Sequence, residues 1–196
     1  NGIAALDEHE RTALLEAAIW HDAGKSHHIF QQTIPNCAPF RSSWAKSPLK
    51  TKPYGRKGFR HELASALAML ANGKPDLAVY LAAAHHGKVR LSIRSLPHEA
   101  RPPEVGRRFA RGVWEGDVLP DTQLCEGTIM PETFLRLSYM ELGEDPVTGP
   151  SWLERMLNLR DTLGPFRLAF LESLLRISDW RASGGSIEGN QEEHKP

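Results

Sequence analysis

The chain has 196 residues, 40% of them hydrophobic, and a formal net charge of zero. This size and composition suit one globular domain with a substantial core, or one domain and a tail, better than two domains. No stretch approaches the roughly 18 consecutive apolar residues of a membrane span. No charged and then apolar leader precedes a cleavage site. Neither membrane insertion nor secretion is indicated, and we expect a cytoplasmic protein.

The two cysteines give no sign of a metal site or a disulfide framework. Cys37 and Cys125 lie far apart in the sequence, and neither belongs to a CxxC pair. Zinc sites and disulfide-rich folds both need more cysteines at closer spacing. We therefore expect two free thiols.

Charge is distributed unevenly along the chain. Residues 23–61 contain no Asp or Glu but many Lys and Arg, with Trp44, Tyr54 and Phe59 among them. Basic residues interleaved with aromatic ones can follow a phosphate backbone and stack on bases. Residues 26–60 are also rich in Pro and Gly, which predicts a long loop rather than a regular element. By contrast, residues 115–145 are rich in acids, and we interpret them as a solvated flank.

The first half of the chain predicts helices. A capping box, Asp7–Glu10, opens a helix that ends near residues 21–22 and has an apolar run of Leu14, Leu15, Ala18 and Ile19. Further helices are predicted over about 60–73 and 76–87, each ending at a glycine.

The second half is less regular. Residues 88–130 predict irregular structure, in which 89–93 alternate like a short strand. A helix is predicted from Pro131 towards Gly143. Another is predicted over 151–163, where it opens with a second capping box.

The last predicted helix starts at Pro165 and ends at Gly184, and the polar residues after it resemble a tail or linker. Within this helix Leu168, Leu171, Leu175 and Asp179 follow a spacing of three and four residues. That spacing places Asp179 on the apolar, inward face of the helix, where a carboxylate needs a partner.

An adjacent His and Asp end the first predicted helix, in the segment Trp20-His21-Asp22-Ala23-Gly24-Lys25. A histidine nitrogen and a carboxylate oxygen can hold one metal ion together, and the carboxylate can also bridge two ions. Gly24 frees the backbone, and Lys25 brings a cation within reach of a phosphate. A lone His-Asp pair is common, but this segment favours metal-assisted phosphate chemistry if further ligands follow.

Further polar residues interrupt the later helices: His61 in Arg60-His61-Glu62, the tandem His85-His86-Gly87, and Asp179 in Ser178-Asp179-Trp180. Each alone has an ordinary structural explanation, such as a helix start or a charge at a helix end. Together, the order H-D, H, H-H, D on a helical background resembles the HD superfamily of metal-dependent phosphohydrolases. With Phe30-Gln31 after the first motif, it resembles more narrowly the HD nuclease domain of the type I CRISPR-associated helicase-nuclease, over residues 7 to about 183.

The resemblance implies a fold and a function. We expect an all-α HD-domain helical bundle over residues 1–183, with a long basic loop and at most a short β-hairpin, followed by a polar tail or linker over 184–196. In that family the domain cleaves single-stranded DNA, exposed by a CRISPR guide-RNA surveillance complex and fed by a helicase, in antiviral defence. The chain has no Walker A motif, so we expect the helicase in a separate polypeptide or in another part of a larger one.

The resemblance also assigns the site residues. Asp22 would bridge two ions, with His21 and Asp179 holding one and His61, His85 and His86 holding the other. Asp22 and Lys25 are the expected catalytic residues, because Lys25 would sit near the scissile phosphate. A ligand set rich in nitrogen favours manganese, iron, cobalt or nickel over magnesium, in one or two sites.

One family feature has no match in the chain. The family has a further metal-binding His on a helix before the His-Asp pair, and the only upstream candidate here is His9. It lies about 18 Å from His21 along the same predicted helix, at roughly 1.5 Å rise per residue, and we expect a surface residue. Because the chain begins with Asn1 rather than Met, we expect the missing ligand in sequence that is absent here.

We expect the DNA to contact basic residues of the loop and of the segment after the tandem histidines, namely Lys46, Lys50, Lys52, Arg56, Lys57, Arg60, Lys88 and Arg90. Two alternatives stay open. One is an HD phosphohydrolase that acts on nucleotides or cyclic dinucleotides, which would need a closed pocket. The other is a nucleic-acid-binding module without catalysis.

Overall fold

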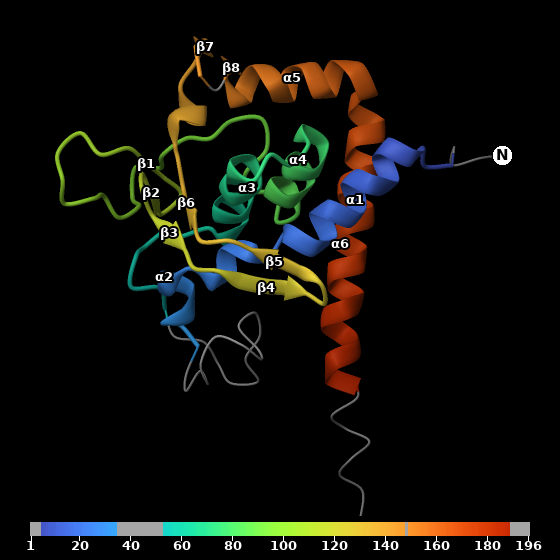
Figure 1. The fold of residues 1–196 in the computed structure, drawn as a ribbon, viewed down its shortest axis with the longest axis horizontal. Coiled ribbons are helices and arrows are strands. Elements are labelled where there is room, and N and C mark those ends of the chain that lie inside the picture. The colour runs from blue at the N-terminus through green and yellow to red at the C-terminus, as the bar shows by residue number, and fades with distance from the viewer. Residues whose placement is uncertain (1–4, 35–52, 148, 189–196) are drawn as a thin grey trace, which may run out of the picture.

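The computed structural model describes residues 5–34, 53–147 and 149–188, and of residues 183–188 it describes the backbone alone. Its core is helical (Figure 1). Helix α4 (Asp76–Ala84) packs against both α1 (Glu8–Trp20) and α3 (His61–Ala71). The long α6 (Pro165–Glu188) contacts α1 and α4 at the right of the view, and α5 (Trp152–Leu163) contacts α4 and α6 at the top. None of the described helices is both long and apolar enough to cross a membrane.

Helices α3 and α4 form the centre of the core. Residues 61–70 of α3 and 77–84 of α4 are all buried, and alanine is frequent in both segments. Small side chains let the axes of two packed helices approach each other closely. The ends of these two helices are therefore held firmly, which matters because the predicted ligands lie there.

Helix α1 begins at the predicted capping box. The Asp7 side chain accepts from the Glu10 N–H and the Glu10 side chain accepts from the Asp7 N–H. The helix is rotated from the predicted apolar face, since Leu15 is 66% exposed and the buried residues are Glu10, Ala13, Ala17 and Trp20. Glu10 tolerates burial because it pairs with Arg167 of α6. This ion pair fixes α1 against α6.

The expected all-α class is wrong in one respect, because the described residues also form short strands. These are β1 (Phe109–Ala110), β2 (Val113–Trp114), β3 (Val118–Leu119), β4 (Thr122–Cys125), β5 (Thr128–Met130), β6 (Thr133–Phe134), β7 (Glu144–Asp145) and β8 (Gly149–Pro150). They form antiparallel pairs β1-β2, β3-β6, β4-β5 and β7-β8. Residues 89–93, which alternate in the sequence, form no strand.

The helix predicted after Pro131 is absent. Residues 131–143 hold strand β6 and a 3-10 helix, η2 (Ser138–Met140), instead. Burial alternates along this segment, with Thr133, Leu135 and Leu137 buried and Phe134 exposed. A period of two is the pattern of a strand with one face on the core. Residues 115–145 are thus in part a wall of the core rather than only a solvated flank.

Helices α5 and α6 begin where the sequence predicts. The Ser151 hydroxyl accepts from the Glu154 N–H at the start of α5, and α6 begins at Pro165. Helix α6 does not stop at Gly184, since its backbone stays helical as far as Glu188. A glycine lowers helix propensity by only about 1 kcal/mol, so two of them need not end a long helix. The division into 1–183 and 184–196 stays a prediction.

Candidate metal centre

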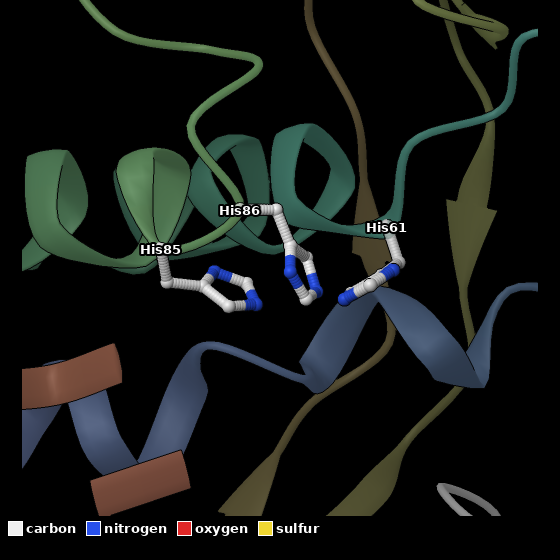
Figure 2. Close-up of side chains that lie close together, drawn as sticks. All are labelled: His61, His85 and His86. Atoms are coloured by element: carbon white, nitrogen blue, oxygen red, sulfur yellow. The ribbon is translucent and has the colours of Figure 1, made fainter. Parts of the chain in front are cut away.

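Five of the predicted metal ligands come together at the termini of three helices. His21 and Asp22 follow the last turn of α1, His61 opens α3, and His85 and His86 follow α4. Figure 2 shows the rings of His61, His85 and His86 lying side by side. The ring centroids of His85 and His86 are 4.0 Å apart, and those of His61 and His86 are 5.0 Å apart. Residues far apart in the sequence thus form one cluster.

His21 and His85 are oriented by the same local contact. Each is the first residue after its helix, with helical backbone angles, and its Nδ1 lies within hydrogen-bond distance of the carbonyl three residues earlier. These distances are 2.8 Å to Ala18 O and 2.6 Å to Ala82 O. A histidine that donates from Nδ1 to a carbonyl keeps the lone pair of Nε2 for a metal. The two helix ends therefore present two Nε2 atoms to the centre.

These nitrogens fit a metal ion. The Nε2 atoms of His21, His61 and His85 are buried and have no hydrogen-bond partner within the described parts of the chain. A buried polar atom without a partner costs free energy, of about 1–3 kcal/mol, unless something binds it. Three such atoms facing one centre fit a bound cation better than a set of structural histidines.

The potential donors form two groups. His61, His85 and His86 offer ligand atoms within 4.8 Å of one another, and so do His21, Asp22 and His85. The sequence assigned His85 to one ion, whereas the structure places it in both groups. Asp179 of α6 lies beside the second group, because its Oδ1 is 3.5 Å from His21 Nε2.

Asp22 belongs to the second group and also faces His61 of the first group. Its Oδ1 is 3.4 Å from His61 Nε2, and its Oδ2 is 3.6 Å from His21 Nε2 and 2.7 Å from Lys25 Nζ. Each carboxylate oxygen thus faces a different histidine. This is the arrangement that a carboxylate bridging two ions requires.

The electrostatics favour the metal-binding protonation states of Asp22 and His85 but not that of His21. Burial lowers the pKa of His21, but Asp179 and Asp22 outweigh burial and raise this pKa above its ordinary value. Burial opposes ionisation of Asp22, but His61, His21 and Lys25 outweigh burial and hold its pKa below the ordinary range. Burial, together with the neighbouring histidines, lowers the pKa of His85 to about 3. An ionised carboxylate and a neutral imidazole bind a cation without first losing a proton.

Ser65 fixes the backbone between the ligands, and the sequence gives no signal for this role. The residue is fully buried within α3, and its hydroxyl donates to His21 O at 2.7 Å and accepts from the Gly24 N–H at 2.8 Å. Gly24 lies in the 3-10 helix η1 (Ala23–Ser26), and a Cβ added to it would lie 2.1 Å from His61 O. The glycine is thus required by close approach to α3.

Glu62 is a second residue whose role at the centre could not be predicted from the sequence. Its side chain is 1% exposed, and neither carboxylate oxygen has a hydrogen-bond partner among the described residues. Its Oε2 lies 3.7 Å from His61 Nδ1, on the opposite side of the ring from Asp22. A negative charge at Nδ1 favours the tautomer that leaves Nε2 free for a metal.

The predicted nucleic-acid contacts have different outcomes. Lys46, Lys50 and Lys52 lie outside the described residues. Lys57 and Lys88 are exposed. Arg60 is 43% exposed, with Nε 4.0 Å from a Glu62 oxygen. Arg90 is 53% exposed and pairs with Glu172 at 3.0 Å.

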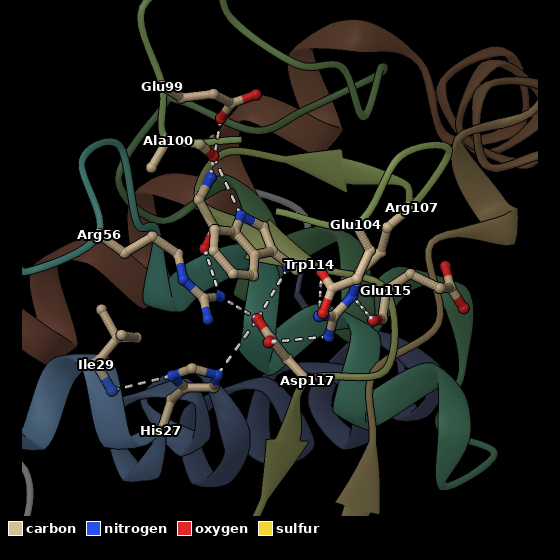
Figure 3. Close-up of polar contacts among 11 residues, drawn as sticks. His27, Ile29, Arg56, Glu99, Ala100, Glu104, Arg107, Trp114, Glu115 and Asp117 are labelled. Atoms are coloured by element: carbon tan, nitrogen blue, oxygen red, sulfur yellow. Dashed lines mark hydrogen bonds and ion pairs between the residues drawn. The ribbon is translucent and has the colours of Figure 1, made fainter. Parts of the chain in front are cut away.

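Arg56 is buried, which corrects its assignment as a phosphate contact. Its guanidinium pairs with Asp117, donates to Gly112 O at 3.1 Å and lies 3.7 Å from the Trp114 ring centroid (Figure 3). The fully buried His27, which caps α2 (His28–Gln31), faces the same carboxylate at 3.4 Å. Arg56 therefore anchors residues 53–60 to the β1-β2 hairpin, just before His61.

His9 does not join the cluster. It is exposed on the first turn of α1, which agrees with its interpretation as a surface residue. The expected further ligand upstream stays a prediction.

Comparison with known families agrees with this geometry. The chain matches the family model described as Cas3, HD domain, over residues 3–186, a span that contains every predicted ligand from His21 to Asp179. Neither the curated proteins nor the solved structures include a significant match. Cas3 HD domains are metal-dependent nucleases of the HD superfamily. The chain therefore belongs to the Cas3 HD-domain family.

Proposed function

We propose that the chain hydrolyses phosphodiester bonds of single-stranded DNA, with one or two divalent transition-metal ions bound by His21, Asp22, His61, His85, His86 and Asp179. The observation that carries the proposal is that the buried Nε2 atoms of His21, His61 and His85, which have no hydrogen-bond partner among the described residues, gather around the Asp22 carboxylate. Family membership supports the broader class of metal-dependent nuclease.

Bound divalent ions supply positive charge at the scissile phosphate and lower the pKa of a water molecule. The chain supplies the rest. Asp22 contacts a histidine of each donor group and adds a negative charge that balances the positive charge of bound ions. Lys25, 17% exposed and ion-paired with Asp22, places a further cation at the edge of the centre, where phosphate charge develops.

Nitrogen donors dominate the ligand set, and this favours manganese, iron, cobalt or nickel over magnesium, which prefers oxygen. The neutral state of His85 supports the same order, because imidazole binds these metals through a free lone pair. We propose the ions as resident cofactors of the chain.

Aromatic and basic side chains beside the centre support a single-stranded polymer as substrate. The Phe30 ring centroid is 5.9 Å from that of His61 and 5.9 Å from Lys25 Nζ, and Tyr54, close to Phe30, is 38% exposed. Flat side chains can stack on bases only when the bases are unpaired and unstacked. In the cell we propose that a helicase and a CRISPR guide-RNA complex supply such a strand, as part of antiviral defence.

The test uses circular single-stranded DNA and a panel of nucleotides and cyclic dinucleotides, each incubated with the chain and manganese. We expect cleavage of the circle, which also demonstrates endonuclease activity, and little turnover of the nucleotides. Nucleotide turnover with intact DNA would overturn the proposal in favour of a nucleotide phosphohydrolase.

The matched variants are Asp22→Ala, at the centre, and Asp121→Ala, at an exposed position remote in sequence from the ligands. We expect the first to lose metal and cleavage and the second to retain both. Cleavage that persists unchanged in Asp22→Ala would come from a contaminant, and the chain would then be a binding module without catalysis.

A further inference from the structure

Helix α6 contributes other side chains to the surroundings of the centre besides that of Asp179. A pocket of about 400 Å³ is lined by His85 and His86, which follow α4, and by Arg176, Ile177, Asp179 and Trp180 of α6. This volume falls within the range of about 300–1,000 Å³ that is typical of small-ligand sites. The metal centre and the α6 side chains therefore share one cavity.

Trp180 is an unusual wall for this pocket. It is 77% exposed and Ile177 is 44% exposed, although both are large and apolar. Single exposed apolar residues are common on protein surfaces and mean little alone. Trp180 differs because it lines the same pocket as His85, His86 and Asp179, so it lies beside the centre rather than on a remote surface.

Arg176 adds charge to the same wall. It lies four residues before Trp180, so the two side chains share one face of the helix. No carboxylate among the described residues pairs with the Arg176 guanidinium, and the side chain is exposed. A flat apolar ring and a free cation one helical turn apart match a base and its phosphate.

We infer that this pocket binds the nucleotide next to the scissile phosphate, with its base stacked on Trp180 and its phosphate close to Arg176. The inference rests on the proposed function and names a subsite within it. The indole is largely exposed to solvent, so the rest of the strand can continue past it. A polymer suits this shape better than a free nucleotide, which a nucleotide hydrolase would enclose.

The experiment compares Trp180→Ala and Trp180→Phe with Phe166→Ala. Phe166 is 91% exposed on the same helix, about 21 Å away along the axis at roughly 1.5 Å per residue, and serves as the control for loss of an exposed aromatic ring. The probes are an oligothymidylate and a strand of the same length in which every base is replaced by hydrogen. Binding is measured by fluorescence anisotropy without metal, and hydrolysis is measured with manganese.

We expect Trp180→Ala to weaken binding and hydrolysis of the oligothymidylate by about 5- to 150-fold, the cost of losing one stacked base. Trp180→Phe should recover most of this loss, because phenylalanine keeps a stacking face. Phe166→Ala should match the unmodified chain. The strand without bases should respond to none of the three substitutions.

Three results would overturn the inference. Equal affinities of Trp180→Ala and Phe166→Ala for the oligothymidylate would mean that no base stacks on the indole. An equal loss on both strands, or a loss of bound manganese, would assign Trp180 to the structure of the centre. A change of mass in solution without a change in DNA binding would assign it to a protein interface.

Failure of the proposed function is distinguishable from these results. In that case the unmodified chain itself would leave the oligothymidylate intact in manganese, whatever residue 180 is. A nucleotide subsite beside the centre would then have no substrate.

Discussion

Replacing Ser65 with alanine tests whether the metal centre depends on a hydrogen-bond bridge hidden inside α3. The Ser65 hydroxyl joins the carbonyl of His21 to the N–H of Gly24, and so it clamps the segment that carries Asp22. Alanine fits the helix and has a higher helix propensity than serine, so the substitution should not disturb α3 itself. Any loss of stability then comes from the two abandoned backbone groups.

The expected magnitude follows from burial. Ser65 is 0% exposed, so water cannot replace its hydroxyl without a rearrangement of the core. An abandoned buried polar group costs about 1–3 kcal/mol, and two of them cost about 2–6 kcal/mol. For a chain of this length each kcal/mol lowers the melting temperature by about 2–4 °C, so we expect a fall of about 4–24 °C.

The assays are thermal unfolding of the metal-free chain and titration with manganese. Because the bridge positions His21 and Asp22, we expect manganese to bind about 10- to 100-fold more weakly, as for other residues that support metal ligands. Ser173→Ala is the control, since that hydroxyl donates only to Ala169 O on the exposed side of α6. If Ser65→Ala and Ser173→Ala agreed within about 0.5 kcal/mol in stability and in manganese affinity, the clamp would have no role.

Three further predictions address the surroundings of the centre. Gly24→Ala should abolish manganese binding, because the new Cβ would lie 2.1 Å from His61 O, whereas Gly55→Ala meets only Gln32 at 3.7 Å and should bind manganese normally by calorimetry. Glu62→Gln keeps the side-chain shape but removes the charge beside His61, and we expect about 10- to 100-fold weaker manganese binding with an unchanged far-ultraviolet circular dichroism spectrum. Burial opposes ionisation of Asp117, but His27 and Arg56 hold its pKa below the ordinary value. The ionised carboxylate therefore stabilises the fold above about pH 4, and this stabilisation is lost as the pH falls through the pKa of the folded state. Urea midpoints measured from neutral pH into this acid range should fall less steeply for Asp117→Asn, and an unchanged slope would contradict the assignment.

The sequence predicts the helices better than the strands. Helices α1, α4, α5 and α6 start at capping residues or prolines, which are local signals, and they begin close to the predicted positions. The strands are two to four residues long, so their alternation is too short to stand out. The segment after Pro131 has a good helix-start signal, but pairing of β6 with β3 and burial of Leu135 and Leu137 outweigh it. Tertiary contacts of this kind leave little trace in the sequence.

For the site, the metal-ligating residues could be predicted from the sequence, but the residues that position them could not. His61, His85 and Asp179 stand out because they interrupt apolar helices, and the structure brings them to one place. Ser65 and Glu62 have equally important contacts, yet a serine or glutamate in a helix is ordinary. Arg56 was misassigned for a related reason, since a basic residue in a basic loop gives no hint that Asp117, sixty-one residues later, buries it.

The directions of the helices explain why a cation suits this place. Helices α1 and α4 both point their C-terminal ends at the centre, and the C-terminal end of a helix carries partial negative charge. The Nδ1 atoms of His21 and His85 hydrogen-bond to carbonyls in these last turns. These bonds fix the orientation of the rings and raise the basicity of Nε2. Helix α3 enters with its N-terminal, positive end, which would oppose a cation at His61. The buried Glu62 in its first turn offsets that end, and this accounts for a buried carboxylate that has no hydrogen-bond partner among the described residues. The ligands from His21 to His86 are therefore readable in the sequence because they mark helix ends, whereas Asp179 lies within α6 and is readable from its place on the inward face.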